Sequence, residues 1–128
     1  MGVPDSEEPQ PIMTTTFDER ERGFEAKFAH DEELKFLALA RRDKLFALWA
    51  VERAGAAGAA REQLIHDLLA VQGFPDHDAA LLRLAAARLA GAAALEAPAA
   101  LERLGNEARE QLLRGEAKPI DLAAPPPR

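Results

Sequence analysis

Cysteine and tyrosine are absent from this chain of 128 residues, and serine occurs once, at Ser6. Without cysteine the chain cannot form disulfides, thiolate metal sites or a cysteine nucleophile, and it fits a reducing compartment. It also lacks an uninterrupted apolar run of the ~20 residues that a membrane-spanning helix needs. The first residues carry Asp5, Glu7 and Glu8, which is the wrong charge for an export signal. We therefore expect a cytoplasmic protein with no direct membrane insertion.

Basic residues are too few for nucleic-acid binding. The chain has 16 Lys and Arg against 22 Asp and Glu, a formal net charge of -6, whereas neutralising phosphates requires a basic surplus. Aromatic residues make up only 5% of the chain, and β-branched residues are scarce beside abundant alanine. This composition favours helices over strands. We predict an all-α protein of one domain that does not bind nucleic acid.

Proline is missing from the middle of the chain. Seven of the nine prolines lie near the ends, and none occurs between Ile12 and Phe74. Proline-rich polar segments bury too little apolar surface to offset the entropy lost on ordering. We therefore predict a disordered extension over residues 1–12 and a disordered tail over residues 116–128.

An amphipathic helix is indicated over residues 13–30. Thr16 and Glu19 form a capping-box pattern, in which each side chain bonds the backbone amide of the other at a helix start. Three large apolar residues follow at helical spacing on one face: Phe17, Phe24 and Phe28. Gly23 lies among them and costs about 1 kcal/mol relative to Ala in a helix interior. We predict a mobile helix that is marginal on its own.

Residues 31–115 show the pattern of four further helices. Apolar positions recur at helical spacing over four segments: 31–54, 59–72, a segment from a cap at Asp76 or Asp78 to about residue 90, and 98–114. Gly55, Gly73, Gly91 and Gly115 are the expected stops, and Pro98 is expected in the first turn of the last helix. Short connections favour antiparallel neighbours. We predict a four-helix bundle with Trp49 in its core.

Catalytic chemistry is not indicated. The three histidines, His30, His66 and His77, lie far apart in the sequence, and none is in a metal-ligand motif, so we expect solvated or capping roles. The basic cluster of residues 41–44 offers guanidinium groups for weak binding of adenine nucleotide. We favour a solvated helix face for it. The sequence therefore predicts a protein that is not an enzyme and has neither a cofactor nor a metal.

The phenylalanine stripe has two interpretations. In one, Phe17, Phe24 and Phe28 pack onto the protein's own bundle. In the other, they are anchors for a groove on a partner, as in helix-in-groove recognition. Large apolar side chains surrounded by charge suit such docking.

Two sequence strings resemble one protein family. These are F-E-A-K-F-A-H-D-E-E-L at residues 24–34 and A-R-R-D-K-L-F-A-L-W at residues 40–49. They resemble the zeta-subunit family, the small bacterial inhibitor subunits of the F-type ATP synthase. The similarity is dense over residues 13–54, and beyond them only helix order and length agree. The resemblance implies a four-helix bundle with a mobile N-terminal helix.

The resemblance also implies a function and a site. The N-terminal helix would insert between the catalytic subunits near the rotor shaft and block ATP hydrolysis while leaving synthesis possible. The matching partner-binding positions are Phe17, Asp18, Arg20, Phe24, Glu25 and Phe28. We expect a monomer when free, located in the cytoplasm at the periphery of the membrane-bound synthase. The alternative is a small nucleotide-sensing or adaptor protein with no inhibitory role.

Overall fold

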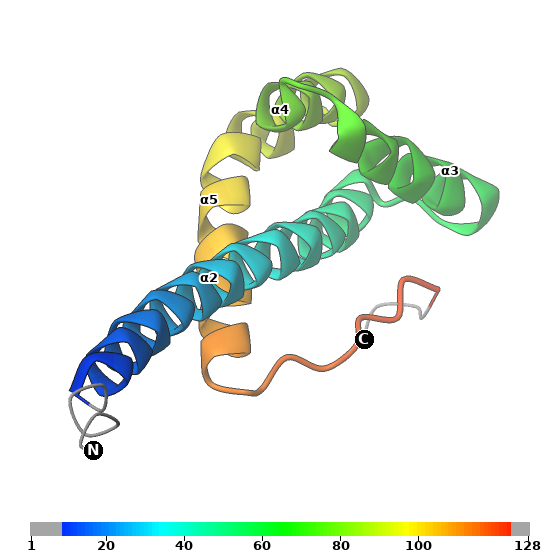
Figure 1. Ribbon diagram of the computed structural model, residues 1–128. Helices are drawn as coiled ribbons and strands as arrows, with labels where there is room; N and C mark the ends of the chain where they lie inside the picture. The colour runs from blue at the N-terminus through cyan, green and yellow to red at the C-terminus, as the bar shows by residue number, and fades with distance from the viewer. Residues whose placement is uncertain (1–8, 124–128) are drawn as a thin grey trace, which may run out of the picture. The chain divides into compact units, whose positions relative to one another are not determined.

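The structure, a computed structural model, describes residues 9–123, with side chains from residue 18 onward. Four α-helices and one 3-10 helix follow in order: α2 (Pro9–Ala54), α3 (Gly58–Leu69), η1 (Ala70–Gly73), α4 (His77–Arg88) and α5 (Ala92–Leu113) (Figure 1). No strand occurs within these residues. The prediction of an all-α protein is confirmed. The chain divides into two units, Met1–Lys35 and Phe36–Arg128, which we describe separately.

Helix α2 is longer than predicted. The sequence suggested one helix to residue 30 and another from residue 31, but α2 runs unbroken from Pro9 to Ala54. Thr16 lies inside it, so the capping-box start at Thr16 is wrong, and part of the expected disordered extension is helical. Asp31, which could have capped a second helix, instead pairs with Lys27 one turn earlier. With no proline past its first turn, the helix has no strong breaker.

Glycine ends α2 as the sequence predicts. Gly55 has φ 65°, a left-handed conformation that residues with a side chain rarely adopt. Its amide donates to Glu52 O at 3.1 Å, and the Ala56 amide donates to Val51 O at 3.0 Å. This pair of bonds is a Schellman motif, which satisfies the last carbonyls of the helix.

Helix α5 begins six residues earlier than the sequence predicted. Pro98 lies inside α5, six residues after its first residue, although an interior proline gives up one helical hydrogen bond. The helix begins after Gly91, whose φ 59° and ψ -133° suit only glycine. The left-handed stop expected at Gly73 is also wrong, because Gly73 has no positive φ and ends the 3-10 helix η1.

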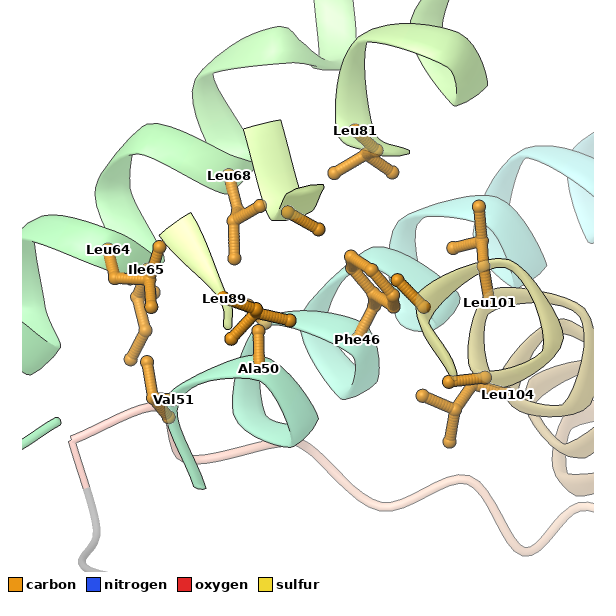
Figure 2. Packing of buried hydrophobic residues seen from close by; sticks show 14 of the residues in the cluster. Phe46, Ala50, Val51, Leu64, Ile65, Leu68, Leu81, Leu89, Leu101 and Leu104 are labelled. Atoms are coloured by element: carbon orange, nitrogen blue, oxygen red, sulfur yellow. The ribbon is translucent and has the colours of Figure 1, made fainter. Parts of the chain in front are cut away.

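The core of the second unit is built from all of its helices (Figure 2). Phe46 of α2, Leu68 of α3 and Leu81 of α4 are fully buried within it. Small residues such as Ala50 and Ala97 let the helices approach closely. Trp49 is only partly buried and stacks on Phe46 with ring centroids 5.4 Å apart. The antiparallel order of the bundle stays a prediction.

The segment after α5 is packed over its described part. Residues 116–123 are not helical, as predicted, but Leu122 is partly buried and packs against the core cluster. Two arginines donate to backbone carbonyls of this segment. The prediction of a disordered tail therefore does not hold for these residues.

Candidate functional site

The first unit presents a highly charged helix surface over its described side chains. Arg20 and Glu25 are exposed, and Asp18 is half-buried. Lys27 pairs with Asp31 at 3.2 Å, and Lys35 pairs with Glu32 at 3.4 Å. Pairs one turn apart stabilise a solvated helix by a few tenths of a kcal/mol each, about 0.2–0.5. These ion pairs favour the helical conformation of the segment.

Two large apolar rings interrupt this charged surface. Phe24 is 76% exposed and Phe28 is 66% exposed. They lie four residues apart and therefore on the same side of α2. Neither ring belongs to the buried core cluster of the second unit. The side chain of Phe17 lies outside the described residues.

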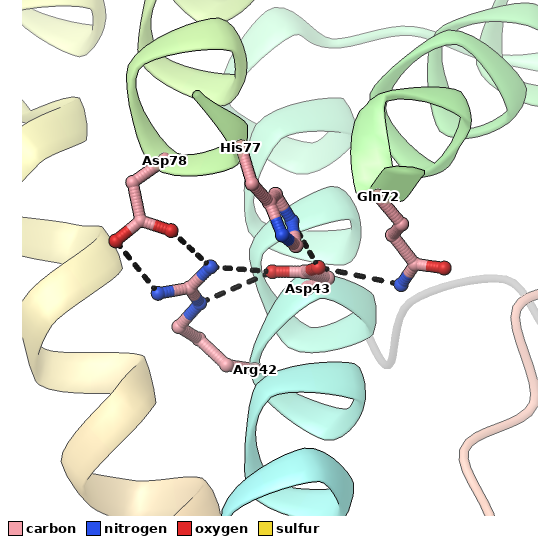
Figure 3. A network of polar contacts seen from close by, with 5 residues as sticks. All are labelled: Arg42, Asp43, Gln72, His77 and Asp78. Atoms are coloured by element: carbon pink, nitrogen blue, oxygen red, sulfur yellow. Dashed lines mark hydrogen bonds and ion pairs between the residues drawn. The ribbon is translucent and has the colours of Figure 1, made fainter. Parts of the chain in front are cut away.

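A buried polar cluster occupies the second unit, between α2, η1 and α4 (Figure 3). The Asp43 side chain has no exposed surface, and its Oδ1 accepts hydrogen bonds from Arg42 Nε at 3.1 Å and Nη2 at 2.9 Å. Gln72 donates to Asp43 Oδ2 at 3.3 Å. Arg42 also donates to both oxygens of Asp78, at 2.8 and 3.3 Å. Arg42 and Asp43 of α2 are thereby joined to Gln72 of η1 and to Asp78 of α4.

The hydrogen bonds between Arg42 and Asp78 stabilise the charged form of each side chain. Burial alone would lower the pKa of the Arg42 guanidinium, but the hydrogen bond to Asp78 and the charge of Asp43 outweigh it and raise the pKa. The same hydrogen bond from Arg42 holds the pKa of Asp78 below its usual range against the opposing effect of burial. Arg42 therefore stays charged. A buried ion pair of this kind organises the packing of α2 against α4 more than it adds stability.

His77, the first residue of α4, completes the cluster. Its Nε2 lies 2.7 Å from Asp43 Oδ2. The prediction of a solvated or capping histidine is wrong for His77, which is mostly buried. It holds for His30 and His66, which are exposed. No group of three His, Cys, Asp or Glu in the described part of the chain is arranged to hold a metal.

The basic cluster of residues 41–44 is not the solvated face that the sequence suggested. Arg42 and Asp43 are buried, Arg41 is half-buried, and only Lys44 is exposed. The signal was present in the spacing, because Asp43 precedes the core residues Phe46 and Ala47 by three and four positions and so shares their face. A charged residue on a core face needs a partner.

Comparison with known proteins decides the family. The sequence matches the family described as ATPase inhibitor subunit zeta over residues 13–111, which is most of the chain. The chain belongs to this family. The resemblance drawn from residues 24–34 and 40–49 is therefore confirmed. No curated protein and no solved structure matches the chain.

Membership gives the chain a coarse role. A zeta-family protein is an inhibitor subunit of an ATPase, which is a regulatory role. None of the described helices is both long and apolar enough to cross a membrane. All six positions that the sequence predicts to bind a partner lie in the first unit, and the polar cluster lies in the second.

Proposed function

We propose that this zeta-family chain inhibits ATP hydrolysis by an F-type ATP synthase by inserting the α2 segment of residues 13–30 at the catalytic interface. The observation that supports this is the exposure of Phe24 and Phe28 on one side of a highly charged segment of α2. Exposed neighbouring apolar rings are uncommon on soluble proteins unless they meet a partner. The partner surfaces are those of the catalytic subunits and the rotor shaft.

The binding energy would come mainly from the two rings. Each phenylalanine can bury roughly 150–250 Å² on docking. At about 25 cal/mol per Å² this is a gross gain of several kcal/mol per ring, from which association and ordering costs are subtracted. A segment that is already helical has fewer dihedrals to fix, so more of that gain appears as affinity.

Charged residues beside the rings would set orientation. Arg20 and Glu25 are exposed and carry opposite charges, which suits salt-sensitive contacts at the rim of a groove. Asp18 is half-buried, and its carbonyl accepts a hydrogen bond from Arg22 Nε at 3.4 Å. Phe17 would be a third apolar anchor. We propose these positions as the partner-binding set and expect no cofactor.

The structure does not favour the nucleotide-sensing alternative. Arg41 donates to Gln111 and to Lys118 O, and Arg42 is shared by two carboxylates. Guanidinium groups engaged in this way must break internal bonds before they bind a phosphate. We also propose that the free protein is a monomer in the cytoplasm, at the periphery of the membrane-bound synthase, and that it acts by steric blockade alone.

Inhibition of ATP hydrolysis by the soluble part of a cognate synthase tests this proposal. Phe24→Glu would place an unpaired charge in the apolar groove and should lower inhibitory potency by at least about tenfold. Leu95→Glu is the matched control, since Leu95 is 84% exposed but lies on α5. Both variants should melt like the wild type. Equal inhibition by wild type and a folded Phe24→Glu protein would refute the inserted-helix mechanism.

A further inference from the structure

The segment that follows α5 is tied to two other helices. Arg41 Nη1 of α2 donates to Lys118 O at 2.6 Å, and Arg61 Nη1 of α3 donates to Leu122 O at 2.6 Å. Leu122 itself packs against the core cluster. Residues 116–123 thus connect α2 with α3 by hydrogen bonds to backbone carbonyls and one apolar side chain.

The return of the chain toward α2 begins at the end of α5. Gly115 has φ 71°, and the Glu116 amide donates to Gln111 O at 2.8 Å, which closes the helix. Arg41 links this turn to the segment, because its Nε donates to Gln111 Oε1 at 2.6 Å while its Nη1 reaches Lys118 O. One guanidinium therefore holds both ends of the turn.

The attachment is sparse compared with the helices. Lys118, Asp121 and Ala123 are exposed, and only Ala117, Ile120 and Leu122 are half-buried. Segments with few buried apolar contacts open at lower free energy than the core to which they attach. The family match also ends at residue 111, so these residues lie beyond the part that identifies the family.

We propose that residues 116–123 are a detachable clasp, which closes over α2 and α3 through Arg41, Arg61 and Leu122 and opens as a unit while the helices stay folded. When it opens, Arg41 loses its bond to Lys118, and the core surface beneath Leu122 meets solvent. This is a conformational device of the second unit, and it does not depend on the inhibitory mechanism.

Thiol labelling measures the opening directly, because the chain has no cysteine of its own. Three single-cysteine variants are compared. Leu122→Cys and Ala123→Cys lie at a half-buried and an exposed position of the clasp, and Ala47→Cys lies in the core, where Ala47 is fully buried. The reaction rate with an aromatic disulfide reagent is recorded for the full-length protein in native buffer. Circular dichroism checks that each variant keeps its helices.

If the clasp opens as a unit, the variants should show three well-separated labelling rates. Leu122→Cys should react at least about tenfold more slowly than the exposed Ala123→Cys, and at least about a hundredfold faster than Ala47→Cys, which needs global unfolding. Ile120→Cys, which leaves Leu122 in place, should react on the same intermediate scale. Rates equal to that of Ala123→Cys would show that no closed clasp exists. Rates equal to that of Ala47→Cys would show that the segment belongs to the core.

The arginine anchor is tested in the same assay. Adding Arg41→Ala to Ile120→Cys should raise the labelling rate by about tenfold, or about 1.4 kcal/mol, because one charge-assisted hydrogen bond to the clasp is lost. Arg109→Ala is the matched control, since Arg109 donates hydrogen bonds to Asn106 of its own helix. It should leave the rate within about twofold. An unchanged rate with Arg41→Ala would overturn the proposed anchoring.

Discussion

Arg42 and Asp78, 36 residues apart in the sequence, are joined by two hydrogen bonds of 2.8 and 3.3 Å. The bond pair fixes the first turn of α4 to the C-terminal third of α2, about one turn before the core residue Phe46. Because Arg42 also bonds the buried Asp43, the contact couples a solvated carboxylate to an internal one. The position of α4 on α2 is thus specified by charge as well as by shape.

Removing the internal carboxylate should be severe. Asp43→Ala leaves Arg42 buried with a single, largely exposed partner and leaves Gln72 without its acceptor. Breaking a buried pair on one side costs roughly 3–5 kcal/mol, which urea unfolding measures. Asp76→Ala is the control, because Asp76 pairs with Arg83 at the surface and should cost less than about 1 kcal/mol. Equal losses for both variants would contradict the internal role of Asp43.

Stability should fall in acid, in part through Asp78. Its pKa is lowered by the hydrogen bond from Arg42, so the carboxylate favours the folded state above the ordinary aspartate pKa of about 3.9. That contribution is lost as pH falls through the lower folded-state pKa. Asp67 and Asp76 have pKa values lowered in the same direction by Arg88 and Arg83. We expect the melting temperature to drop between about pH 5 and pH 2.

Asp78→Asn isolates this contribution. The variant should be less stable than the wild type at pH 7 and should approach it as the pH falls through the lowered pKa of Asp78, where the carboxylate becomes protonated. The difference at pH 7 should stay below about 1 kcal/mol, because the Asp78 side chain is 63% exposed and solvent screens the pair. Melting curves at matched ionic strength measure it. A difference that stays constant with pH would show that the charge of Asp78 has no part in it.

Local rules predicted the helical class and several ends from the sequence. Gly55 and Gly115 adopt the left-handed stops that their positions suggested, since a helix end with φ above zero favours glycine. Helix starts were harder. Thr16 carries a start pattern inside α2, because a capping pattern contributes only about 1 kcal/mol and does not stop a helix from beginning earlier. Pro98 lies within α5, because core packing of that helix outweighs the roughly 3 kcal/mol that an interior proline costs.

The candidate site, too, could be predicted only in part from the sequence. The stripe of Phe24 and Phe28 follows from helical period alone, whereas its exposure depends on what covers it, which period does not encode. The polar cluster needs contacts across 29 to 36 residues of sequence, from Gln72 and Asp78 to α2. Such long-range pairs depend on how the helices pack. His77 was therefore misassigned, although the core-facing position of Asp43 could be read from its spacing.

A third prediction concerns Gly105, which lies against Arg42. A Cβ added at Gly105 would lie 3.2 Å from Arg42 Cδ, closer than ordinary van der Waals contact. Alanine normally gains about 1 kcal/mol over glycine inside a helix. Here Arg42 is pinned by its bonds to two carboxylates and cannot withdraw, so Gly105→Ala should be destabilising by about 1 kcal/mol or more.

The sign should reverse when the arginine stem is absent. In an Arg42→Ala background, itself destabilised, adding Gly105→Ala should recover about 1 kcal/mol of unfolding free energy through helix propensity alone. Urea unfolding of the four proteins in this cycle provides the comparison. The same effect of Gly105→Ala in both backgrounds would mean that Arg42 does not limit the site.

The last prediction concerns Gly23, one residue before the exposed ring of Phe24. Gly23 lies inside α2, and a Cβ added there meets nothing within 4 Å, so alanine introduces no clash. Alanine lowers the free energy of the helix by about 1 kcal/mol relative to glycine. If the segment binds as a helix and is partly unwound when free, Gly23→Ala should raise inhibitory potency by up to about fivefold.

Exposed glycines elsewhere provide the control for this test. Gly73→Ala also meets nothing within 4 Å and has no positive φ, but it lies in η1 of the second unit, so it should leave inhibition unchanged. Titration of ATP hydrolysis with wild type, Gly23→Ala and Gly73→Ala gives the three potencies, and far-UV circular dichroism of residues 1–35 as a peptide gives the helix content directly. A peptide whose helicity rises with Gly23→Ala while potency stays constant would show that the segment does not bind as a helix. Higher potency with higher helicity, together with the loss in Phe24→Glu, would indicate that helix formation and apolar contact act together in the inhibitory segment.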